Sequence, residues 1–409
     1  MSLKFLLVQW AGTAYVGLVS LGLSFLVARQ LGPASFGDYG VALAGGALLG
    51  IALDGGFKTL LLRERTLATG TLARLVSRLH AVAMGHALAV SIIMSAVALV
   101  LVPERRGLAF ATVACFLGVA LSQFVSGALR GEGRFIADAA WQAWVRTLSA
   151  IAILMALAAG AEEPIWILLA WALGSLAAVF VFPHGQTRRP RLEWHPEVYR
   201  AAAFLLWVDL ATVVYFRADM LLLGAMGVPA GEIGQYAAAY SIIEALILAT
   251  APASLLVFRS LRLERQARTR LRARLVRALV IAAVAGALAA GALMALSEEL
   301  IGVAFGSSYR ESARLLDVLA WALFFILPNA VLTQAAIALN RERAYAVMAT
   351  TAAIFNVGLN TWLIPRHGAL GASWATVATE AWLFALLAFG MVRWCTERDK
   401  GVPDKRFST

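Results

Sequence analysis

Charged residues are scarce in this 409-residue sequence, in which Asp, Glu, Lys and Arg together make up 14%. Apolar residues make up 61% even with glycine left out, against roughly 45–50% with glycine included for soluble domains. The few charges lie in short clusters between apolar stretches of roughly 18–25 residues, the length of helix that crosses about 30 Å of hydrocarbon. This distribution excludes a soluble globular domain and predicts an integral membrane protein.

Cysteine and catalytic motifs are also scarce. Cys115 and Cys395 are far apart in the sequence, so neither a disulfide framework nor a metal site follows from them. The sequence has no Walker A loop, no His-Glu-x-x-His and no Cys-x-x-Cys, which argues against an ATP-driven pump and leaves us expecting no catalytic residue and no cofactor. Membrane-spanning β-strands would be half as long and would alternate polar with apolar residues, so we predict a helical bundle.

Twelve transmembrane helices are predicted from hydropathy, Pro and Gly breaks and charge clusters. They are placed at about 5–28, 38–60, 80–102, 108–129, 137–160, 164–183, 200–224, 233–258, 277–297, 315–339, 344–364 and 370–392. The first apolar stretch is too long for a signal-peptide core and lacks a convincing small-residue cleavage site. It is therefore expected to be the first span.

Positive charge is divided unevenly between the two sides of this bundle. With twelve spans both termini share one side, which carries 27 of the 35 Lys and Arg residues. By the positive-inside rule we expect both termini in the cytoplasm. The net charge of +11 is therefore attributed mainly to orientation, and no nucleic-acid partner is expected. The eight arginines between positions 259 and 277 could also hold anionic membrane lipid.

An internal repeat divides the chain into halves. It pairs Leu31-Gly32 and the following Phe36-Gly37-Asp38-Tyr39 with Leu223-Gly224 and the following Ile233-Gly234-Gln235-Tyr236. Each half holds six spans, so the halves have the same orientation and should be related by an axis along the membrane normal. We predict an all-α fold of two six-helix lobes around a central cavity. The lobes cover 1–190 and 200–395, with a linker at 191–199 and a cytoplasmic tail at 396–409.

Ionisable residues inside spans are costly and by default face a bundle interior or a wet cavity. The acidic candidates are Asp219, Glu244 and Glu380, with Asp54 near the inner end of the second span. They could balance charge or bind a driving ion. Alternatively, Asp219 and Glu244 could only hold helices in register through arginine partners, and Asp54 could be a helix-end residue.

Two arginines within spans are the sharper candidates for substrate binding. Arg146 shares a helical face with Gln142, and Arg217 lies in the seventh span. A guanidinium can grip a phosphate through two parallel hydrogen bonds, which suits a pyrophosphate headgroup. Arg29 is a further candidate at an outer helix end, where it could equally be a snorkelling anchor. Polar stripes such as that of Gln142 could instead only join helices.

Several motifs resemble one known family. They are Ala28-Arg29-Gln30-Leu31-Gly32-Pro33 with Phe36-Gly37-Asp38-Tyr39, Arg217-Ala218-Asp219 with Gly234-Gln235-Tyr236-Ala237-Ala238-Ala239-Tyr240, and the run from Ile364-Pro365-Arg366-His367-Gly368 to Glu380. In this order they resemble the Wzx-type polysaccharide exporters of the multidrug/oligosaccharidyl-lipid/polysaccharide (MOP) superfamily. The resemblance runs over nearly the whole chain.

The resemblance implies a flippase rather than an enzyme. It would move a polyprenyl-pyrophosphate-linked oligosaccharide across a bacterial inner membrane by alternating access, driven by a proton or sodium gradient. Such proteins carry cationic side chains in the cavity, which Arg146 and Arg217 could supply, and polysaccharide polymerase or other assembly proteins are expected partners. A multidrug cation antiporter of the same superfamily is the first alternative. A membrane-bound glycan ligase or polymerase is the second.

Overall fold

The structure is a computed structural model that describes residues 3–67, 71–181, 190–193, 196–264 and 267–396. These residues form helices and connecting turns, and no β-strand occurs among them. The long helices are α1 (Leu3–Asp54), α3 (Thr71–Leu101), α4 (Arg106–Gly131), α5 (Phe135–Ala158), α6 (Pro164–Val181), α7 (Pro196–Ala225), α8 (Ala230–Leu263), α9 (Arg268–Phe305), α10 (Arg310–Ala338) and α11 (Glu342–Thr396). Shorter elements are α2 (Phe57–Leu67) and the 3-10 turns η1 (Pro103–Arg105) and η2 (Ser307–Tyr309).

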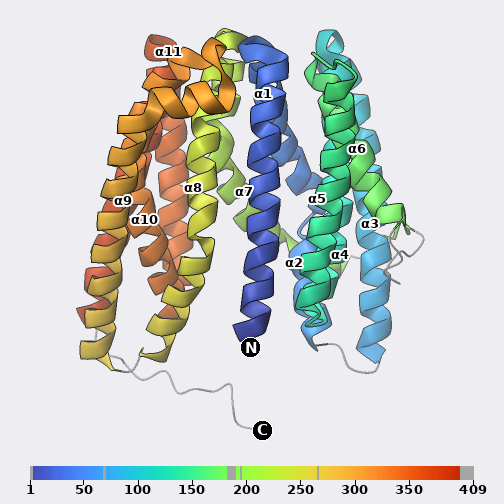
Figure 1. The fold of residues 1–409 in the computed structure, drawn as a ribbon. Coiled ribbons are helices and arrows are strands. Elements are labelled where there is room, and N and C mark those ends of the chain that lie inside the picture. Colours follow the sequence, from blue (N-terminus) through green and yellow to red (C-terminus); the bar gives the residue numbers. More distant parts are fainter. Residues whose placement is uncertain (1–2, 68–70, 182–189, 194–195, 265–266, 397–409) are drawn as a thin grey trace.

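Helices α1 and α11 are each two transmembrane segments joined at a kink. Gly32 (φ 70°) and Gly368 (φ 55°) have backbone conformations that side chains other than glycine's rarely adopt. Pro33 and Pro365 add to the interruption, because proline has no backbone N–H to donate. The chain reverses direction at the kink in α1 (Figure 1). When the two halves of α1 and of α11 are counted separately, the long helices supply the twelve segments that the sequence predicts. Among the described residues, eight helices are long and apolar enough to cross a membrane.

One predicted boundary is wrong by several residues. The second span was expected to continue to about residue 60, but α1 ends at Asp54. Gly55 and Gly56 follow with φ values of 57° and 79°, which break the helix, and α2 then starts separately at Phe57.

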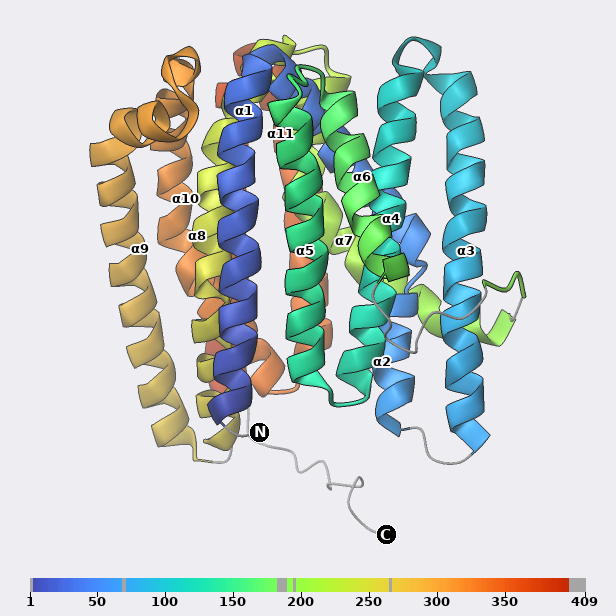
Figure 2. The ribbon, with the colours of Figure 1, turned by 45° about the vertical axis from the view of Figure 1, so that its right-hand side comes forward.

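The helices form two groups with α1 between them. Helices α2 to α6 lie on one side of α1 and α8 to α10 on the other (Figures 1 and 2), and α11 lies beside α9 and α10 in the view of Figure 1. Helix α1 packs against α5 and α4 of the first group, against α8 of the second, and against α7. The lobe boundaries at 190 and 200 stay predictions. The predicted linker, 191–199, is described only in part, and apart from Thr396 the predicted tail lies outside the described residues.

The two repeats meet through a pair of glycines at the end of the bundle that holds the kinks, which we call the kink end. Gly37 of α1 and Gly234 of α8 occupy equivalent positions in the repeat. A side chain at Gly37 would overlap the carbonyl of Ala230, and one at Gly234 would overlap the carbonyl of Pro33. Each glycine therefore touches the residue four positions before the other, so the contact has the two-fold character of the repeat. Neither position has room for a β-carbon.

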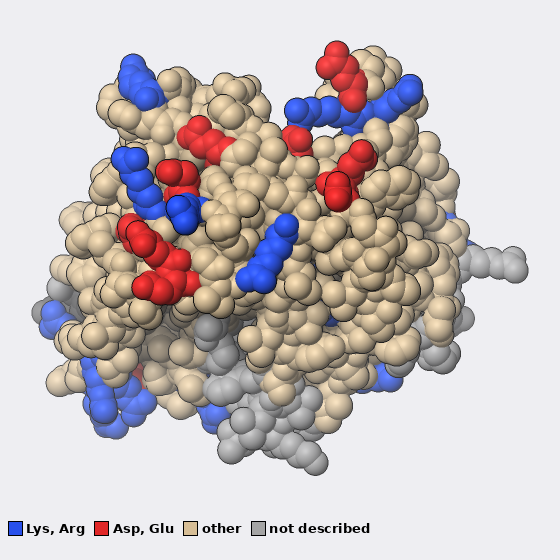
Figure 3. Space-filling model, turned by 45° about the horizontal axis from the view of Figure 1, so that its top comes forward, with Lys and Arg blue, Asp and Glu red and all other residues tan. Residues whose placement is uncertain are grey.

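Further contacts close the kink end between α1 and the α9–η2 turn. The Tyr309 hydroxyl donates to the carbonyl of Ala28 at 2.8 Å. The rings of Phe25 and Phe305 lie edge to face with centroids 5.0 Å apart. On this face acidic and basic side chains are interspersed among uncharged ones (Figure 3).

At the opposite end, which we call the N-terminal end, α7 packs against both groups of helices. Its first turns lie on the N-terminal group, where the backbone of Ala202 approaches Gly56 and the Tyr199 hydroxyl lies 3.3 Å from a His86 ring nitrogen. Its later turns pack against α11. Helix α7 therefore joins the two lobes.

Candidate functional site

The N-terminal lobe contains a partly buried arginine for which the described residues supply no ion-pair partner. Arg146 lies in the middle of α5, and its guanidinium carbon is 5.1 Å from the centroid of the Trp171 ring of α6. Its Nε atom is buried and makes no hydrogen bond. Its neighbouring ionisable groups are Tyr39 and Cys115, and no carboxylate of the described chain lies within ion-pair distance of it. A cation held in this way is available to an anionic ligand.

Asp138, in the first turn of α5, is held by polar side chains of α4 and α5. Asp138 is fully buried and accepts a hydrogen bond from Arg130 Nε at 2.7 Å. Gln142 also donates to Asp138, at 2.9 Å, and Ser126 donates to its other carboxylate oxygen. Gln142, predicted to bind substrate, lies one turn from Arg146, but its amide nitrogen is engaged by the carboxylate of Asp138.

Arg217, the second predicted arginine, is paired. Its Nη1 atom lies 2.8 Å from Oε1 of Glu244, which joins α7 to α8. The two side chains are 33% and 37% exposed, so part of the pair lies at an accessible surface. The structure thus brings together two residues for which the sequence suggested separate roles.

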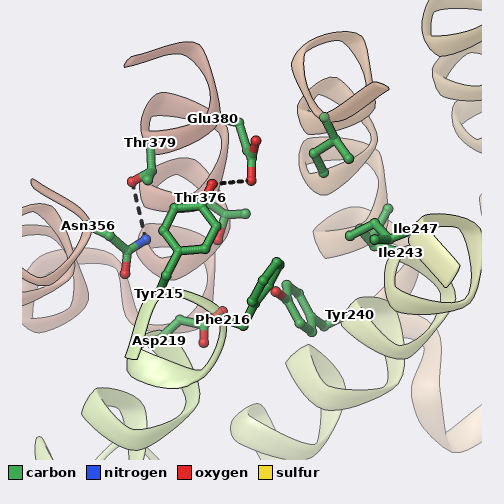
Figure 4. A pocket seen from close by; sticks show the side chains of 11 residues that line it. Tyr215, Phe216, Asp219, Tyr240, Ile243, Ile247, Asn356, Thr376, Thr379 and Glu380 are labelled. Atoms are coloured by element: carbon green, nitrogen blue, oxygen red, sulfur yellow. Dashed lines mark hydrogen bonds between the residues drawn. The ribbon is translucent and has the colours of Figure 1, made fainter. Parts of the chain in front are cut away.

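The C-terminal lobe contains a small polar pocket (Figure 4). It is lined by Tyr215, Phe216, Asp219, Tyr240, Ile243, Ile247, Ile326, Asn356, Thr376, Thr379 and Glu380. Two carboxylates, Asp219 and Glu380, therefore face one cavity from α7 and α11 (Figure 4).

Each pocket carboxylate is held by hydrogen bonds. Asp219 accepts from the Tyr236 hydroxyl and from the Met220 backbone N–H at 2.7 Å. Glu380 accepts from the Tyr215 hydroxyl and from Asn329 Nδ2 at 2.8 Å. Burial of both carboxylates is tolerated because these donors replace water.

Arg29 and Asp54 lie away from these groups. Arg29 is exposed at the kink end and donates to the carbonyls of Ala304, at 3.0 Å, and Val303 at the C-terminus of α9. Asp54 accepts a hydrogen bond from the backbone N–H of Lys58 at 3.0 Å, so it caps the start of α2. The contacts of both residues are those of helix ends.

Several residues that define the site were not singled out from the sequence. The stacking partner Trp171 and the donors Tyr215, Tyr236 and Asn329 each come from a helix other than that of the charged group they contact. Helical spacing gives one signal, since Tyr236, Tyr240 and Glu244 recur every fourth residue of α8. No group of three or more His, Cys, Asp or Glu residues in the described part of the chain could hold a metal ion.

Comparisons with known proteins identify both a family and a fold. A model of the family "Polysaccharide biosynthesis protein" matches residues 4–258. No curated protein sequence matches.

The solved structures that the chain resembles are membrane transporters. The structure titled lipid II flippase MurJ, inward closed conformation, superposes with a TM-score of 0.77 at 14% identity, covering 96% of this chain and 89% of that one. An inward-facing multidrug resistance MATE family transporter of the MOP superfamily gives 0.68 at 12% identity, over 95% and 98%. An outward-facing one gives 0.61 at 13% identity, over 96% and 94%. At these identities the likeness shows the MOP fold, in agreement with the sequence prediction.

Proposed function

Because the chain belongs to the polysaccharide biosynthesis protein family, we propose that it is a flippase for a polyprenyl-pyrophosphate-linked oligosaccharide. The substrate would cross a bacterial inner membrane between the two lobes by alternating access. One structural neighbour is a lipid II flippase, which agrees with a lipid-linked substrate. The sequence lacks a Walker A loop, a His-Glu-x-x-His motif and a Cys-x-x-Cys motif, so none of these supports an enzyme.

The observation that carries the substrate class is the unpaired guanidinium of Arg146. An arginine within a membrane bundle normally pairs with a carboxylate or a carbonyl, because leaving it unpaired is costly. Arg146 is stacked on Trp171 instead, and its Nε atom has no acceptor. A pyrophosphate offers several acceptor oxygens that match the fork of guanidinium donors. Arg146 is therefore the proposed primary contact of the headgroup.

The carboxylates of the C-terminal pocket are the proposed site of the driving ion. Asp219 and Glu380 line one pocket together with the oxygen-bearing side chains of Asn356, Thr376 and Thr379. Carboxylate, amide and hydroxyl oxygens are ligands for hard cations, and a carboxylate can also take up a proton. A proton or a sodium ion would bind better in one of the two transport states and so bias the equilibrium between them. Arg29 and Asp54 are assigned structural roles.

The proposed orientation follows from charge. The side of the bundle with the termini carries most of the Lys and Arg residues, so the N-terminal end would face the cytoplasm. The kink end would then face outward. Since the lobes touch closely through Gly37 and Gly234 at the kink end, the structure corresponds to a state closed to the outside.

The direct test is the sidedness of lipid-linked glycans in cells that lack the protein. We expect these glycans to accumulate and to lie on the inner leaflet, where an impermeant glycan-modifying reagent does not reach them. Expression of the wild-type protein should return them to the outer leaflet. Unchanged amount and sidedness would overturn the proposal.

The pocket carboxylates also favour a second candidate, a multidrug cation antiporter. A cationic drug needs acidic partners within the membrane, and Asp219 and Glu380 supply two. The two functions are separated by a drug-sensitivity panel. An antiporter would change resistance to cationic drugs, whereas a flippase would change only glycan export.

A further inference from the structure

The two arginines within the bundle differ in what occupies them. Arg146 has no carboxylate within reach in the described chain, whereas Arg217 is bound by Glu244 at 2.8 Å. Glu244 is the one carboxylate in ion-pair contact with Arg217 among the described residues. Thus one anion-binding group is open and the other is occupied by the protein's own carboxylate.

Glu244 is held less firmly than its acidic neighbours. Asp219 accepts hydrogen bonds from a tyrosine and a backbone N–H, and Glu380 accepts them from a tyrosine and an asparagine. The contact found for Glu244 in the described structure is its ion pair with Arg217. Glu244 is also 37% exposed, whereas Asp219 and Glu380 are buried. Of the three carboxylates, Glu244 can therefore leave its partner at the lowest cost.

A phosphate offers Arg217 the same kind of acceptor as Glu244 does. Carboxylate and phosphate oxygens present similar acceptors to a guanidinium, and a phosphate carries more charge. Arg217 is 33% exposed, so an anion approaching from solvent can reach it. Asp219, two positions further along α7, does not compete, because residues i and i+2 of a helix face different directions and its own donors hold it.

We propose that Glu244 is a built-in competitor that occupies the anion subsite of Arg217 and is displaced by the pyrophosphate headgroup of the substrate. The identity of the anion rests on the proposed function. Competition by Glu244 lowers the affinity of Arg217 for the headgroup. When the substrate leaves, Glu244 pairs with Arg217 again. A transporter must release what it binds, so a charged partner that re-forms an ion pair on release favours turnover. Glu244 is thus a residue that sets substrate affinity.

The test is a binding measurement with farnesyl pyrophosphate as the probe, on purified protein in lipid nanodiscs by titration calorimetry. Glu244→Gln removes the competing charge and keeps the shape, so the affinity should rise by about three- to tenfold. Arg217→Gln should lower the affinity. In the Arg217→Gln background, adding Glu244→Gln should leave the affinity for farnesyl pyrophosphate unchanged, because the guanidinium for which Glu244 competes is then absent.

A matched control separates competition from a general gain of positive charge. Glu264→Gln breaks another arginine–glutamate pair, with Arg274 at 2.9 Å, at the N-terminal end of the bundle. It changes the net charge by the same amount and should leave the affinity for farnesyl pyrophosphate unchanged. An equal gain in Glu264→Gln would overturn the assignment to Glu244.

The outcomes also distinguish this proposal from the proposed function. If Arg146→Gln weakens binding but Glu244→Gln does not strengthen it, the competitor role fails and the flippase reading stands. If Glu244→Gln strengthens binding equally for farnesyl pyrophosphate and for a cationic drug, the effect is not competition for Arg217. If neither the wild type nor Glu244→Gln binds the probe, both proposals fail.

Discussion

Arg146 and Arg366 make the same contact in different surroundings. Each guanidinium carbon lies 5.1 Å from the centroid of a tryptophan ring, that of Trp171 or Trp362. Arg366 is exposed at the kink end and donates to the Trp362 carbonyl at 2.6 Å, whereas the Nε atom of Arg146 is buried without a partner. Both arginines therefore stack on a tryptophan. Of the two, Arg146 is the one whose Nε atom is buried without a hydrogen-bond acceptor.

This difference predicts the effect of removing each charge. Arg146→Gln should lower the affinity for farnesyl pyrophosphate by at least about tenfold, since a charge-assisted hydrogen bond contributes about 1.5–3 kcal/mol. The affinity of Arg146→Lys should lie between those of the wild type and Arg146→Gln, because lysine keeps the charge but loses the paired donors of the guanidinium. Arg366→Gln, the stacked control, should bind like the wild type in the same calorimetric titration. Equal affinities for Arg146→Gln and Arg366→Gln would refute the assignment of Arg146.

The pocket carboxylates lead to a second prediction at this scale. In proteoliposomes, Glu380→Gln and Asp219→Asn should abolish stimulation of transport by an imposed sodium or proton gradient, because an amide cannot take up a proton and offers a sodium ion no negative charge. Binding of farnesyl pyrophosphate should remain, since Arg146 lies in the other lobe. Flux assays with and without the gradient measure this, with Glu264→Gln as the folded control. Gradient stimulation that survives in both variants contradicts the proposed ion site.

The sequence predicts the charged residues of the site better than their partners. A charge in a span is conspicuous, because the membrane makes it costly. Trp171 and Tyr236 are aromatic residues in apolar helices, where such residues are common, and their contacts depend on how α6 and α8 pack against neighbouring helices. The pairing of Arg217 with Glu244 likewise depends on the relative rotation of α7 and α8. Spacing along a single helix does not specify that rotation.

At the scale of elements, glycine sets both the breaks and the closest contacts. The sequence places a boundary near each kink, but it does not show that one residue, Gly32 or Gly368, is enough to turn the chain. The contact between Gly37 and Gly234 is suggested only by the repeat, which makes the two positions equivalent. Equivalent residues of a repeat touch each other when they lie near the symmetry axis. Which residues lie near that axis can be seen only in the three-dimensional structure.

This contact predicts opposite outcomes for two alanine substitutions in the same helix turn. Gly234→Ala places a methyl group against the Pro33 carbonyl and should lower the free energy of unfolding by about 1–3 kcal/mol through overpacking. At Gly231 nothing lies within 4 Å of the position of a β-carbon, so Gly231→Ala should be neutral or slightly stabilising. Thermal unfolding of the purified variants measures the difference. If both variants unfold at the same temperature, the close contact at Gly234 is not a feature of the protein in the membrane.

At the scale of the whole molecule, the repeat predicts two lobes of equal orientation, and the fold agrees. The sequence could not show which end of the bundle is closed. States of a transporter that are open to either side have the same sequence and differ by a few kcal/mol. Closure at the kink end is therefore a property of this conformation, supported by Tyr309 on Ala28 and by Phe25 on Phe305.

Alternating access requires the kink end to open, which a cross-link can prevent. The Cβ position of Gly40 lies 3.3 Å from Cβ of Ala237, near the separation found in disulfides. Gly40→Cys with Ala237→Cys, in a background where Cys115 and Cys395 are replaced by Ser, should form a disulfide under oxidation and stop transport. Reduction should restore it, and each single cysteine variant should transport under both conditions. Full transport by quantitatively cross-linked protein would mean that the lobes need not separate at this end.

The position of the glycine contact has a mechanical consequence. Gly37 lies near one end of its half of α1, which continues to Asp54. At a rise of 1.5 Å per residue, that half extends about 26 Å beyond the glycine. If the contact acts as a pivot while the kink end stays closed, a rotation of about 10° there displaces the far end of this half of α1 by roughly 4–5 Å, while the backbones at the pivot move very little. A pivot at one end thus converts a change of a fraction of an ångström near the kinks into a movement of several ångströms at the other end.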